Sequence, residues 1–304
     1  METVTAAQSR PQPEPTPRPR QSWKVLAGAA AAVAVVAGVV GLASVGGGST
    51  HTGPAVVDIQ ATDAGLNITG LDAVKPGYTR FSDTNTTDSD HALMIVKLHN
   101  GVTAHDMKAA LESPDGIEAL NKADFYGGVD DVPHHTTWAE TVDLTPGTYV
   151  VLDHAEGHGE GNGAWFSEPG FYFPFTVADA SATNAVKPKA DAVITMRDFA
   201  YDMPATLPAD GVVEFRNEGV QLHMGVLLKL NPGVTVDEAM QNLSDDTTLG
   251  TPLEFIGATS PGTTVSVEQH FEPGTYVIAC LMPDMQRDGT PHAMEGMFSS
   301  FTVS

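Results

Sequence analysis

The sequence predicts an all-β fold class: two tandem Greek-key β-sandwiches, each with one short inserted helix, behind an N-terminal transmembrane helix. Three observations predict it. One set of motifs occurs twice, many short segments alternate apolar and polar residues between turn-forming residues, and a long uncharged apolar run lies near the N-terminus. A chain of 304 residues has room for two domains of ordinary size behind such a helix.

The start of the chain predicts a membrane anchor. Residues 1–22 are rich in proline and are expected to form a disordered cytoplasmic tail. Residues 23–46 contain an apolar run long enough to cross the ~30 Å hydrocarbon core, and basic residues such as Arg20 and Lys24 precede that run. Residues 47–54 then form a linker. We therefore expect a single-pass protein of the cell membrane, with a cytoplasmic N-terminus and extracytoplasmic domains.

A cleaved signal peptide is the alternative interpretation of the same run. Small residues at 43–45 offer a possible cleavage site, and cleavage would give a secreted protein. The run is longer than the apolar core of an ordinary signal peptide, which favours a retained anchor. Both interpretations place the bulk of the chain outside the cytoplasm.

An internal repeat divides the remainder of the chain. The segment HALMIVKL that begins at His91 aligns with HMGVLLKL, which begins at His223, and a PGTYV motif follows each of them. Repeats of this kind indicate copies of one structural unit. The predicted domains are residues 55–180 and 190–304, with a linker at residues 181–189.

Each copy is predicted to consist mainly of strands. In the second copy the expected strands are residues 192–196, 211–216, 223–230, 263–269, 274–280 and 298–303. One short helix interrupts them, because Thr235 and Glu238 form a capping box in front of an apolar stripe, and Thr103 and Asp106 hold the same place in the first copy. Many short strands with one inserted helix indicate an antiparallel sandwich.

The charge and the cysteine content limit the possible functions. A formal net charge of −23 repels nucleic acid and anionic lipid headgroups, so we expect no nucleic-acid partner. Cys280 is the one cysteine, so no disulfide can form within the chain. A free thiol in an oxidising compartment is a liability unless it is buried or bound to a metal.

The residues around Cys280 favour metal binding. Cys280 ends an alternating run, and a loop rich in Pro, Asp and Gly follows, with His292 and then Met297 ahead of a last strand. His223 is the candidate for a second imidazole. Taken singly, these residues are ordinary core or turn residues. Together, a thiolate, two imidazoles and a thioether are the ligands of a blue-copper site.

Two motifs carry a family resemblance. Asn217-Glu-Gly219 followed by His223 is similar to the first-ligand strand of plastocyanin-like domains, and Pro291-His292 followed by Gly296-Met297 is similar to their C-terminal ligand loop. The second copy thus resembles the cupredoxins, the type 1 blue-copper family, and among them the tandem, membrane-anchored proteins of actinobacteria. The first copy shares the resemblance only through the repeat.

The resemblance implies a copper cofactor, as one mononuclear type 1-like site in the C-terminal domain. The implied ligands are His223, Cys280 and His292 in the equatorial plane and Met297 as the weak axial ligand. The eleven residues between Cys280 and His292 exceed the spacing in small cupredoxins, so a perturbed or more exposed copper is an open alternative. The methionines that could compete as axial ligand are Met282, Met285 and Met294.

The first copy lacks this ligand set. Asp153 takes the place of Cys280, and Phe171 takes the place of Met297. His91 keeps the first-ligand position. Two groups could instead bind a harder divalent ion, and they are Asp153, His154, Glu156 and His158, and the pair His134-His135. A structural or docking role for this copy is the default expectation.

The sequence favours a binding protein over an enzyme, with no catalytic residues assigned. Ala279 and Leu281 flank Cys280, so no adjacent histidine connects it to a second, catalytic copper, and no known hydrolase or nucleotide-binding motif occurs. The leading hypothesis is an anchored electron carrier that meets its unknown redox partner at an exposed edge of His292, next to Pro291, Ala293 and Met294. The alternatives are a copper-handling module with an unknown copper donor or acceptor, and a metal-free scaffold.

Overall fold

The computed structural model describes residues 53–304, apart from residues 63–64, 89–90, 112–116, 156–171, 184 and 242–248. Within these ranges, no helix has the length and apolar character needed to cross a membrane. The predicted tail (1–22), the anchor (23–46) and most of the linker (47–54) lie outside the described residues.

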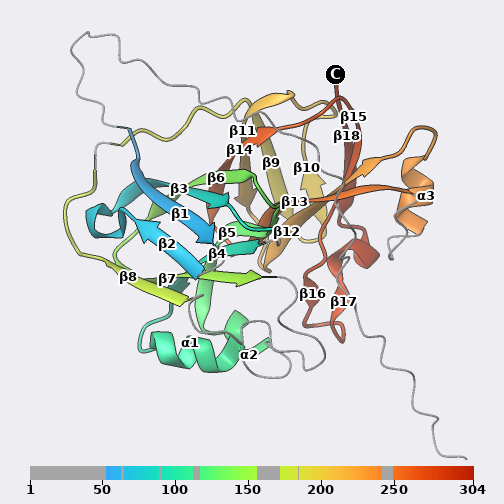
Figure 1. Ribbon diagram of the computed structural model, residues 1–304. Helices are drawn as coiled ribbons and strands as arrows, with labels where there is room; N and C mark the ends of the chain where they lie inside the picture. Colours follow the sequence, from blue (N-terminus) through green and yellow to red (C-terminus); the bar gives the residue numbers. More distant parts are fainter. Residues whose placement is uncertain are drawn as a thin grey trace, which may run out of the picture.

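The described chain is an all-β structure built around two eight-stranded sheets (Figure 1). The first sheet has the order β10 (Ala200–Asp202), β9 (Ala192–Arg197), β11 (Asp210–Asn217), β14 (Thr264–His270), β6 (Thr137–Leu144), β3 (Gly77–Asn85), β1 (Ala55–Thr62), β2 (Gly65–Thr69). The second has the order β18 (Phe298–Val303), β15 (Gly274–Ala279), β12 (His223–Leu230), β13 (Gly250–Thr259), β5 (Ala123–Val132), β4 (His91–Leu98), β7 (Gly147–Ala155), β8 (Tyr172–Val177). Apolar side chains of both sheets share one core cluster.

Short helices and a small hairpin complete the described structure. They are α1 (Ala104–Leu111), α2 (Ile117–Leu120), α3 (Val236–Gln241), the 3-10 turns Leu71–Ala73 and His292–Glu295, and the hairpin of β16 (Pro283–Asp284) and β17 (Thr290–Pro291). Both capping boxes form, because Thr103 and Thr235 exchange hydrogen bonds with Asp106 and Glu238. The first half has two α-helices where the sequence predicted one.

The six strands predicted in the second half are all present, and their bounds differ from the prediction by one residue at most. The sequence pattern did not predict β10, β13 and the β16–β17 hairpin. Strand β13 was not predicted because its sequence, GTPLEFIGAT, contains a proline and two glycines and does not alternate regularly between apolar and polar residues. The other three are only two or three residues long.

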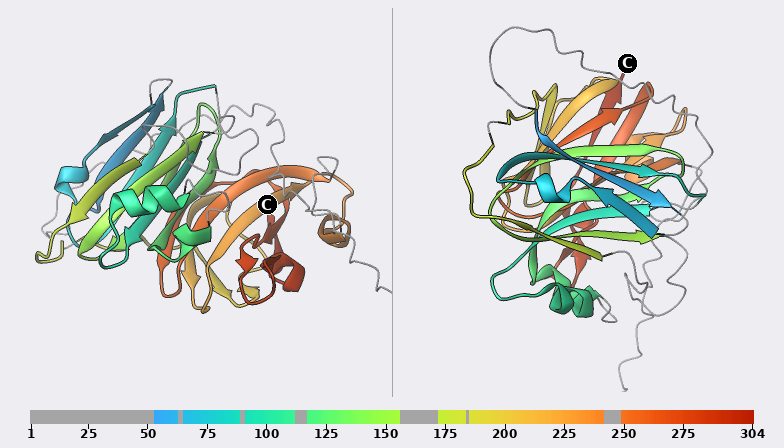
Figure 2. Two further views of the ribbon diagram at one scale, coloured as in Figure 1. Left: turned by 90° about the horizontal axis from the view of Figure 1, so that it is seen from below. Right: turned by 60° about the vertical axis from the view of Figure 1, so that its left-hand side comes forward.

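The two halves of the chain lie side by side and share both sheets (Figure 2). Each half contributes four strands to each sheet, and corresponding strands pair in the same register. Ile95 pairs with Val151 in the first half, and the residues aligned to them, Leu227 and Ile278, pair in the second. The bounds of the two predicted domains remain a prediction, but a continuous core and continuous sheets join them.

The junction between the halves brings equivalent strands together. Strands β6 and β14 pair antiparallel, and at the centre of that pairing Glu140 lies opposite Val267, the residue that the PGTYV alignment equates with it. Nearby, β5 meets β13 through Tyr126 and Thr259. The halves therefore meet about an approximate two-fold axis that passes close to Glu140.

The connection at residues 181–189 is held at both ends. The Thr183 N–H donates to the Pro76 carbonyl at 2.8 Å, and the Lys187 ammonium lies 2.5 Å from the Glu214 carboxylate. Because contacts tie this segment to both halves, it does not act as a free tether between them.

Glu140 is a buried carboxyl group in this junction. Its side chain has no exposed area, one oxygen accepts the Gly128 N–H at 2.9 Å, and the other has no hydrogen-bond partner among the described residues. Burial raises the pKa of Glu140 to about 8, against the smaller lowering effect of the Gly128 N–H. The folded protein thus holds a protonated carboxyl group where its two halves join.

Raising the pH should weaken the fold through Glu140. Since the pKa is higher in the folded than in the unfolded chain, the stabilisation is complete below about pH 4.5 and is lost as the pH rises towards 8, at up to ~1.4 kcal/mol per pH unit. We expect Glu140→Gln to gain stability relative to wild type as pH increases. Urea unfolding at pH 5, 6.5 and 8 measures this difference. The exposed neighbour variant Asp143→Asn should give a constant difference, and the same result for Glu140→Gln would contradict the prediction.

Candidate metal centre

Three side chains with metal-binding atoms converge at one end of the second half. His223 is the first residue of β12, Cys280 directly follows β15, and His292 begins the last 3-10 turn. Strands β12 and β15 pair antiparallel, with Val226 opposite Ala279, so His223 and Cys280 project from neighbouring strands at the same end of the sheet. Irregular register at the start of β12 adjusts the direction of its first residues.

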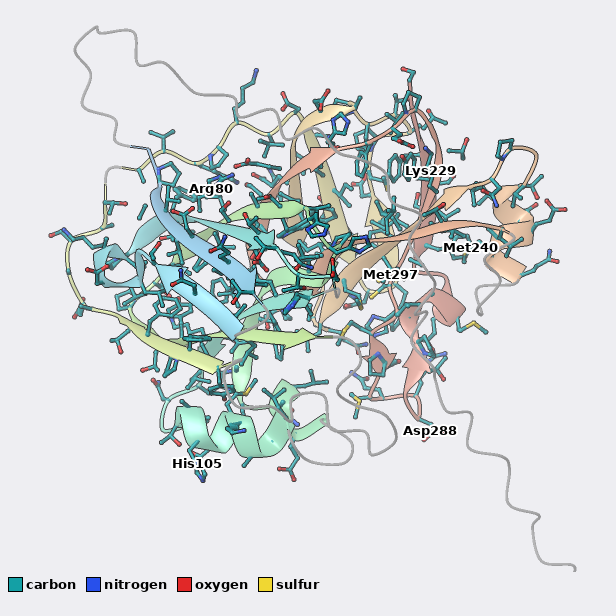
Figure 3. All side chains as sticks on the ribbon, in the orientation of Figure 1. Arg80, His105, Lys229, Met240, Asp288 and Met297 are labelled. Carbon is teal, nitrogen blue, oxygen red and sulfur yellow. The ribbon has the colours of Figure 1, made fainter. Side chains whose placement is uncertain are left out.

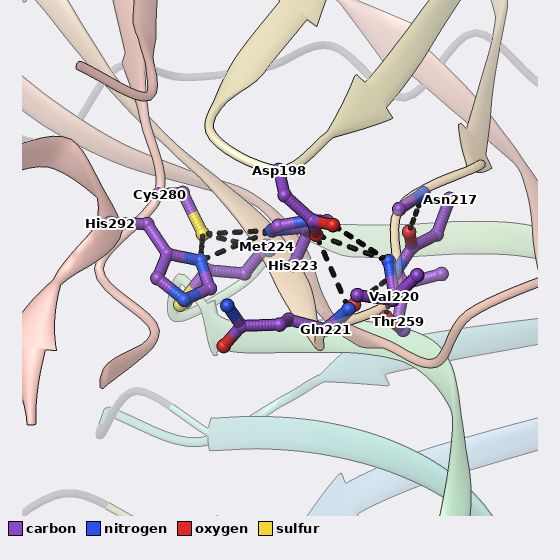
Figure 4. Close-up of polar contacts among 10 residues, drawn as sticks. Asp198, Asn217, Val220, Gln221, His223, Met224, Thr259, Cys280 and His292 are labelled. Carbon is purple, nitrogen blue, oxygen red and sulfur yellow. Dashed lines mark hydrogen bonds and ion pairs between the residues drawn. The ribbon is translucent and has the colours of Figure 1, made fainter. Parts of the chain in front are cut away.

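The three potential ligand atoms face one another (Figure 4). Nδ1 of His223 lies 3.2 Å from Nδ1 of His292, and the Cys280 sulfur lies 3.5 Å from Nδ1 of His292 and 3.9 Å from Nδ1 of His223. The point equidistant from these atoms is about 2.1 Å from each, which is the length of a bond from a metal to nitrogen and close to that of a bond to sulfur. One metal ion fits between them.

The long segment between Cys280 and His292 does not separate the two residues. It leaves and returns as the β16–β17 hairpin, with Asp288 in the turn at the edge of the molecule (Figure 3). At the base of the hairpin the His292 N–H donates to the Met282 carbonyl at 2.9 Å, and the Ala293 N–H donates to the Cys280 carbonyl at 2.8 Å. The extra residues thus build a separate projection, and main-chain hydrogen bonds fix His292 beside Cys280.

Asp198 orients the ring of His223. Its carboxylate lies 2.9 Å from Nε2 of His223, on the side of the ring away from Cys280 (Figure 4). Burial raises the pKa of Asp198, but the N–H groups of Val220 and Gln221 and the His223 ring outweigh that effect and lower it. An ionised carboxylate holds the proton on Nε2 and leaves Nδ1 as the ligand atom, an arrangement typical of metal-bound histidines.

His292 is fully buried, which corrects the expected exposed edge at this residue. The ring of Phe199 packs edge-on against it, with ring centroids 4.9 Å apart. Burial, and secondarily the charge on His223, lowers the pKa of His292 to about 4, so the ring is neutral at physiological pH. Ala293 is buried as well, and Met294 is the exposed residue of this turn.

Cys280 is buried and holds its proton when no metal is bound. Burial raises the pKa of its thiol to about 11, against the N–H groups of Met224 and Met282 and the hydroxyl of Tyr201, which lower it. The Met224 N–H lies 3.5 Å from the sulfur. Because a metal binds the thiolate, loading the site releases this proton.

Met297 is fully buried in the same core cluster as Cys280. Its N–H donates to the His292 carbonyl at 3.0 Å, and its carbonyl accepts the Cys280 N–H at 3.1 Å. Of the competing methionines, Met285 is 55% exposed and Met294 is 69% exposed, whereas Met282 is partly buried beside the core. Burial and main-chain contacts thus favour Met297 for an axial position.

The donor set is that of a mononuclear type 1 copper site in the C-terminal half. A cysteine and two histidines, all without exposed area, place their donor atoms within 4.8 Å of one another, and no other group of three or more His, Cys, Asp or Glu residues in the described ranges does so. A soft thiolate with two imidazoles suits copper in both of its oxidation states.

The first half presents no such cluster among its described residues. His91 is buried at the start of β4, and the main chain of Asp153 pairs with Leu93, so both hold the positions that the alignment gave them. The alternative ligands Asp153, His154, Glu156 and His158 fall outside the described side chains or residues, as does Phe171, the residue predicted to take the place of Met297. Of the His134-His135 pair, His135 lies 3.2 Å from the exposed carboxylate of Asp88.

Sequence reasoning missed two residues that contact the ligands, Asp198 and Phe199. Both lie where β9 turns into β10, about 25 residues before the nearest ligand. Their only local signal was a carboxylate followed by an aromatic residue between two apolar segments.

Known proteins resemble this chain at low sequence identity. No family model matches the chain, and no curated protein matches it. Similar solved structures include auracyanin B, 20% identical over 39% of this chain and 93% of that chain, with a TM-score of 0.25. Auracyanin from Roseiflexus castenholzii is 24% identical over 37% and 94%, with a TM-score of 0.24. Copper nitrite reductase from Nitrosomonas europaea is 12% identical over 82% and 93%, with a TM-score of 0.23.

Replacing Asp198 should weaken metal binding without removing a ligand. In Asp198→Asn the side chain no longer holds the proton on Nε2 of His223 by charge, so we expect copper affinity to fall about 10- to 100-fold. Competition with a chelator of known copper affinity measures this change. The control is Asp202→Asn, which removes an exposed carboxylate from β10. Equal affinity in both variants would contradict a role for Asp198 in orienting His223.

Proposed function

We propose that this protein is a membrane-anchored, extracytoplasmic electron carrier that uses type 1 copper in its C-terminal half. The observation that carries the proposal is the convergence of three buried donor atoms, from His223, Cys280 and His292, on one point at metal-bond distance. With Met297 as the axial ligand, this is the ligand set expected for a blue-copper centre. Bound copper would supply a one-electron couple.

Several contacts keep the ligands in place whether or not the metal changes its charge. Asp198 orients His223, main-chain hydrogen bonds fix His292 and Met297 to Cys280, and Phe199 packs on His292. A site that is held in this way reorganises little when copper gains or loses an electron. Rigid burial therefore supports electron transfer over a chemical reaction at the metal.

Exposed apolar residues gather around the ligand loops. Seven large apolar side chains are exposed among the described residues, and five of them lie within five residues of a proposed ligand in the sequence: Val220, Leu281, Met285, Met294 and Phe298. A hollow of about 400 Å³ is lined by Phe199, Arg287, Thr290, Met294 and Glu295. Met294 and Glu295 belong to the same 3-10 turn as His292. Such a surface fits brief docking of a partner close to the copper.

The charge of this half favours a basic partner. Residues 190–304 hold four Lys or Arg against sixteen Asp or Glu. All four basic side chains are paired with carboxylates: Arg197 with Glu218, Arg216 with Glu214, Lys229 with Glu272 and Arg287 with Glu295. The remaining negative charge would attract a basic redox protein and repel nucleic acid.

The membrane anchor and the role of the first copy are proposed from the sequence. We take residues 23–46 as the anchor, and the two halves as cupredoxin-like copies of the tandem kind that the motifs resemble. The first copy would then act as a scaffold for the second, through the shared sheets. A role outside enzyme catalysis is part of the proposal, because Ala279 and Leu281 give Cys280 no neighbouring ligand for a second copper.

Copper handling is the second candidate function. Met285 and Met294 expose thioethers next to the ligand loop, and such groups are suited to binding Cu(I) on its way to or from a partner. This candidate predicts tight Cu(I) binding without a strong visible band. A metal-free scaffold, the third candidate, predicts that Cys280 can be replaced without consequence for metal content or stability.

Copper reconstitution of the full chain separates these functions. We expect an intense visible thiolate-to-copper band, a narrow copper hyperfine splitting in the paramagnetic resonance spectrum, and reversible one-electron reduction. Cys280→Ser should remove the band and lower copper affinity, and Met285→Leu is the matched control that should change neither. If Cys280→Ser kept the visible band, the copper affinity and the reversible reduction of the wild type, the proposed site would be contradicted. Using the full chain matters, because the two halves share their core.

A further inference from the structure

Phe199 contacts both the buried ring of His292 and a hollow at the surface. It lies in the turn between β9 and β10, and its ring packs edge-on against that of His292, with centroids 4.9 Å apart and planes at 74°. His292 has no exposed area, whereas Phe199 is only partly buried against the core and lines the hollow of about 400 Å³. A molecule seated in the hollow therefore meets Phe199, and Phe199 meets the ligand.

The two histidine ligands differ in the surroundings of their second ring nitrogen. Nε2 of His223 lies 2.9 Å from the Asp198 carboxylate, whereas Nε2 of His292 is buried and has no hydrogen-bond partner among the described residues. A metal-bound histidine usually donates this N–H to a carboxylate, a carbonyl or water. Because Nε2 of His292 is buried, bulk water does not reach it. The packing around His292 thus keeps solvent from a polar atom that would be more stable in contact with it.

The hollow suits a neutral, apolar occupant. Phe199 and Met294 line it with apolar atoms, and Met294 is 69% exposed. The two charged residues of the lining, Arg287 and Glu295, neutralise each other through an ion pair at 3.0 Å. Residues 190–304 around it hold four basic against sixteen acidic side chains. The surface therefore fits a basic protein that inserts an apolar side chain into the hollow.

We propose that Phe199 is a positioning residue that shields His292 and thereby determines which molecules exchange electrons with the copper. The inference rests on the proposed function and names its specificity-determining residue. A basic redox protein that fills the hollow comes into contact with Phe199, one ring away from the ligand. A molecule that cannot enter the hollow stays further from His292, and electron tunnelling falls exponentially with distance.

Solvent exchange of the His292 ring N–H tests the shield without copper. In the metal-free full chain, labelled with heavy nitrogen in its histidines, magnetic resonance should show this N–H to exchange about tenfold faster in Phe199→Ala than in wild type. Phe199→Leu retains most of the side-chain volume and should stay close to wild type. The control is Phe173→Ala, because Phe173 is also partly buried against the main core cluster but lies on β8, at the edge of the second sheet opposite to β18.

Oxidation by a small reagent tests the consequence for the copper. Cobalt(III) tris-phenanthroline takes one electron from Cu(I), which leaves Cu(II) and Co(II). Removing a ring in van der Waals contact shortens the approach to His292 by ~3.5 Å, so Phe199→Ala should react about tenfold faster than wild type after correction for any change in potential. Phe173→Ala and Phe199→Leu should react at close to the wild-type rate.

The outcomes separate this inference from the proposed function. If wild type forms the blue band, and Phe199→Ala exchanges its proton and reacts no faster than Phe173→Ala, the shield is overturned and the copper site stands. A slower reaction in Phe199→Ala would also overturn it. If Phe199→Leu behaved like Phe199→Ala, a loosened fold would explain both, and the role of Phe199 would again be overturned. If wild type binds no copper, the proposed function fails and the specificity role fails with it, whereas the proton exchange still decides whether Phe199 covers His292.

Discussion

The pairing of β12 with β15 is the constraint on which the site depends. It places His223 and Cys280 at the same end of one sheet, although 56 residues separate them in the sequence. The third ligand then needs no further long-range contact, because His292 reaches the sulfur through main-chain hydrogen bonds within the same loop. The metal site thus costs little beyond the formation of the sheet, and any change that shifts the register of these two strands would separate the ligands.

The same framework occurs in the first half without the same chemistry. Asn85 and Asn217 occupy equivalent positions, and each donates its side-chain amide to a carbonyl on the equivalent strand, that of Val132 or Thr259. Tyr149 and Tyr276 also correspond, because each donates its hydroxyl to the carbonyl of the residue four positions earlier in the chain. These contacts hold the sandwich and do not require a metal. The first half therefore keeps the same framework without a cysteine.

The predictability of each feature follows the range of the interaction behind it. Strands and capping boxes depend on periodicity and neighbours in the sequence, so residues such as Thr235 and Glu238 could be identified directly. The ligand types and their order could also be read, because the closing loop carries three of the four residues. The burial of His292 could not, since it depends on Phe199, which approaches from the turn between two strands of the other sheet. Joining of the halves at Glu140 and Val267 likewise depends on a pairing that no local pattern encodes.

One turn supplies a neighbour for each of the two histidine ligands. At the junction of β9 and β10, Asp198 contacts His223 and Phe199 contacts His292. The two contacts differ in kind: a charge that fixes the tautomer of one ring, and an aromatic ring that packs against the other. Ligand identity selects the metal, whereas this turn sets how strongly each ligand donates and how dry the site is. A segment with no ligand of its own can therefore adjust the properties of the centre while the sheets keep the ligands in place.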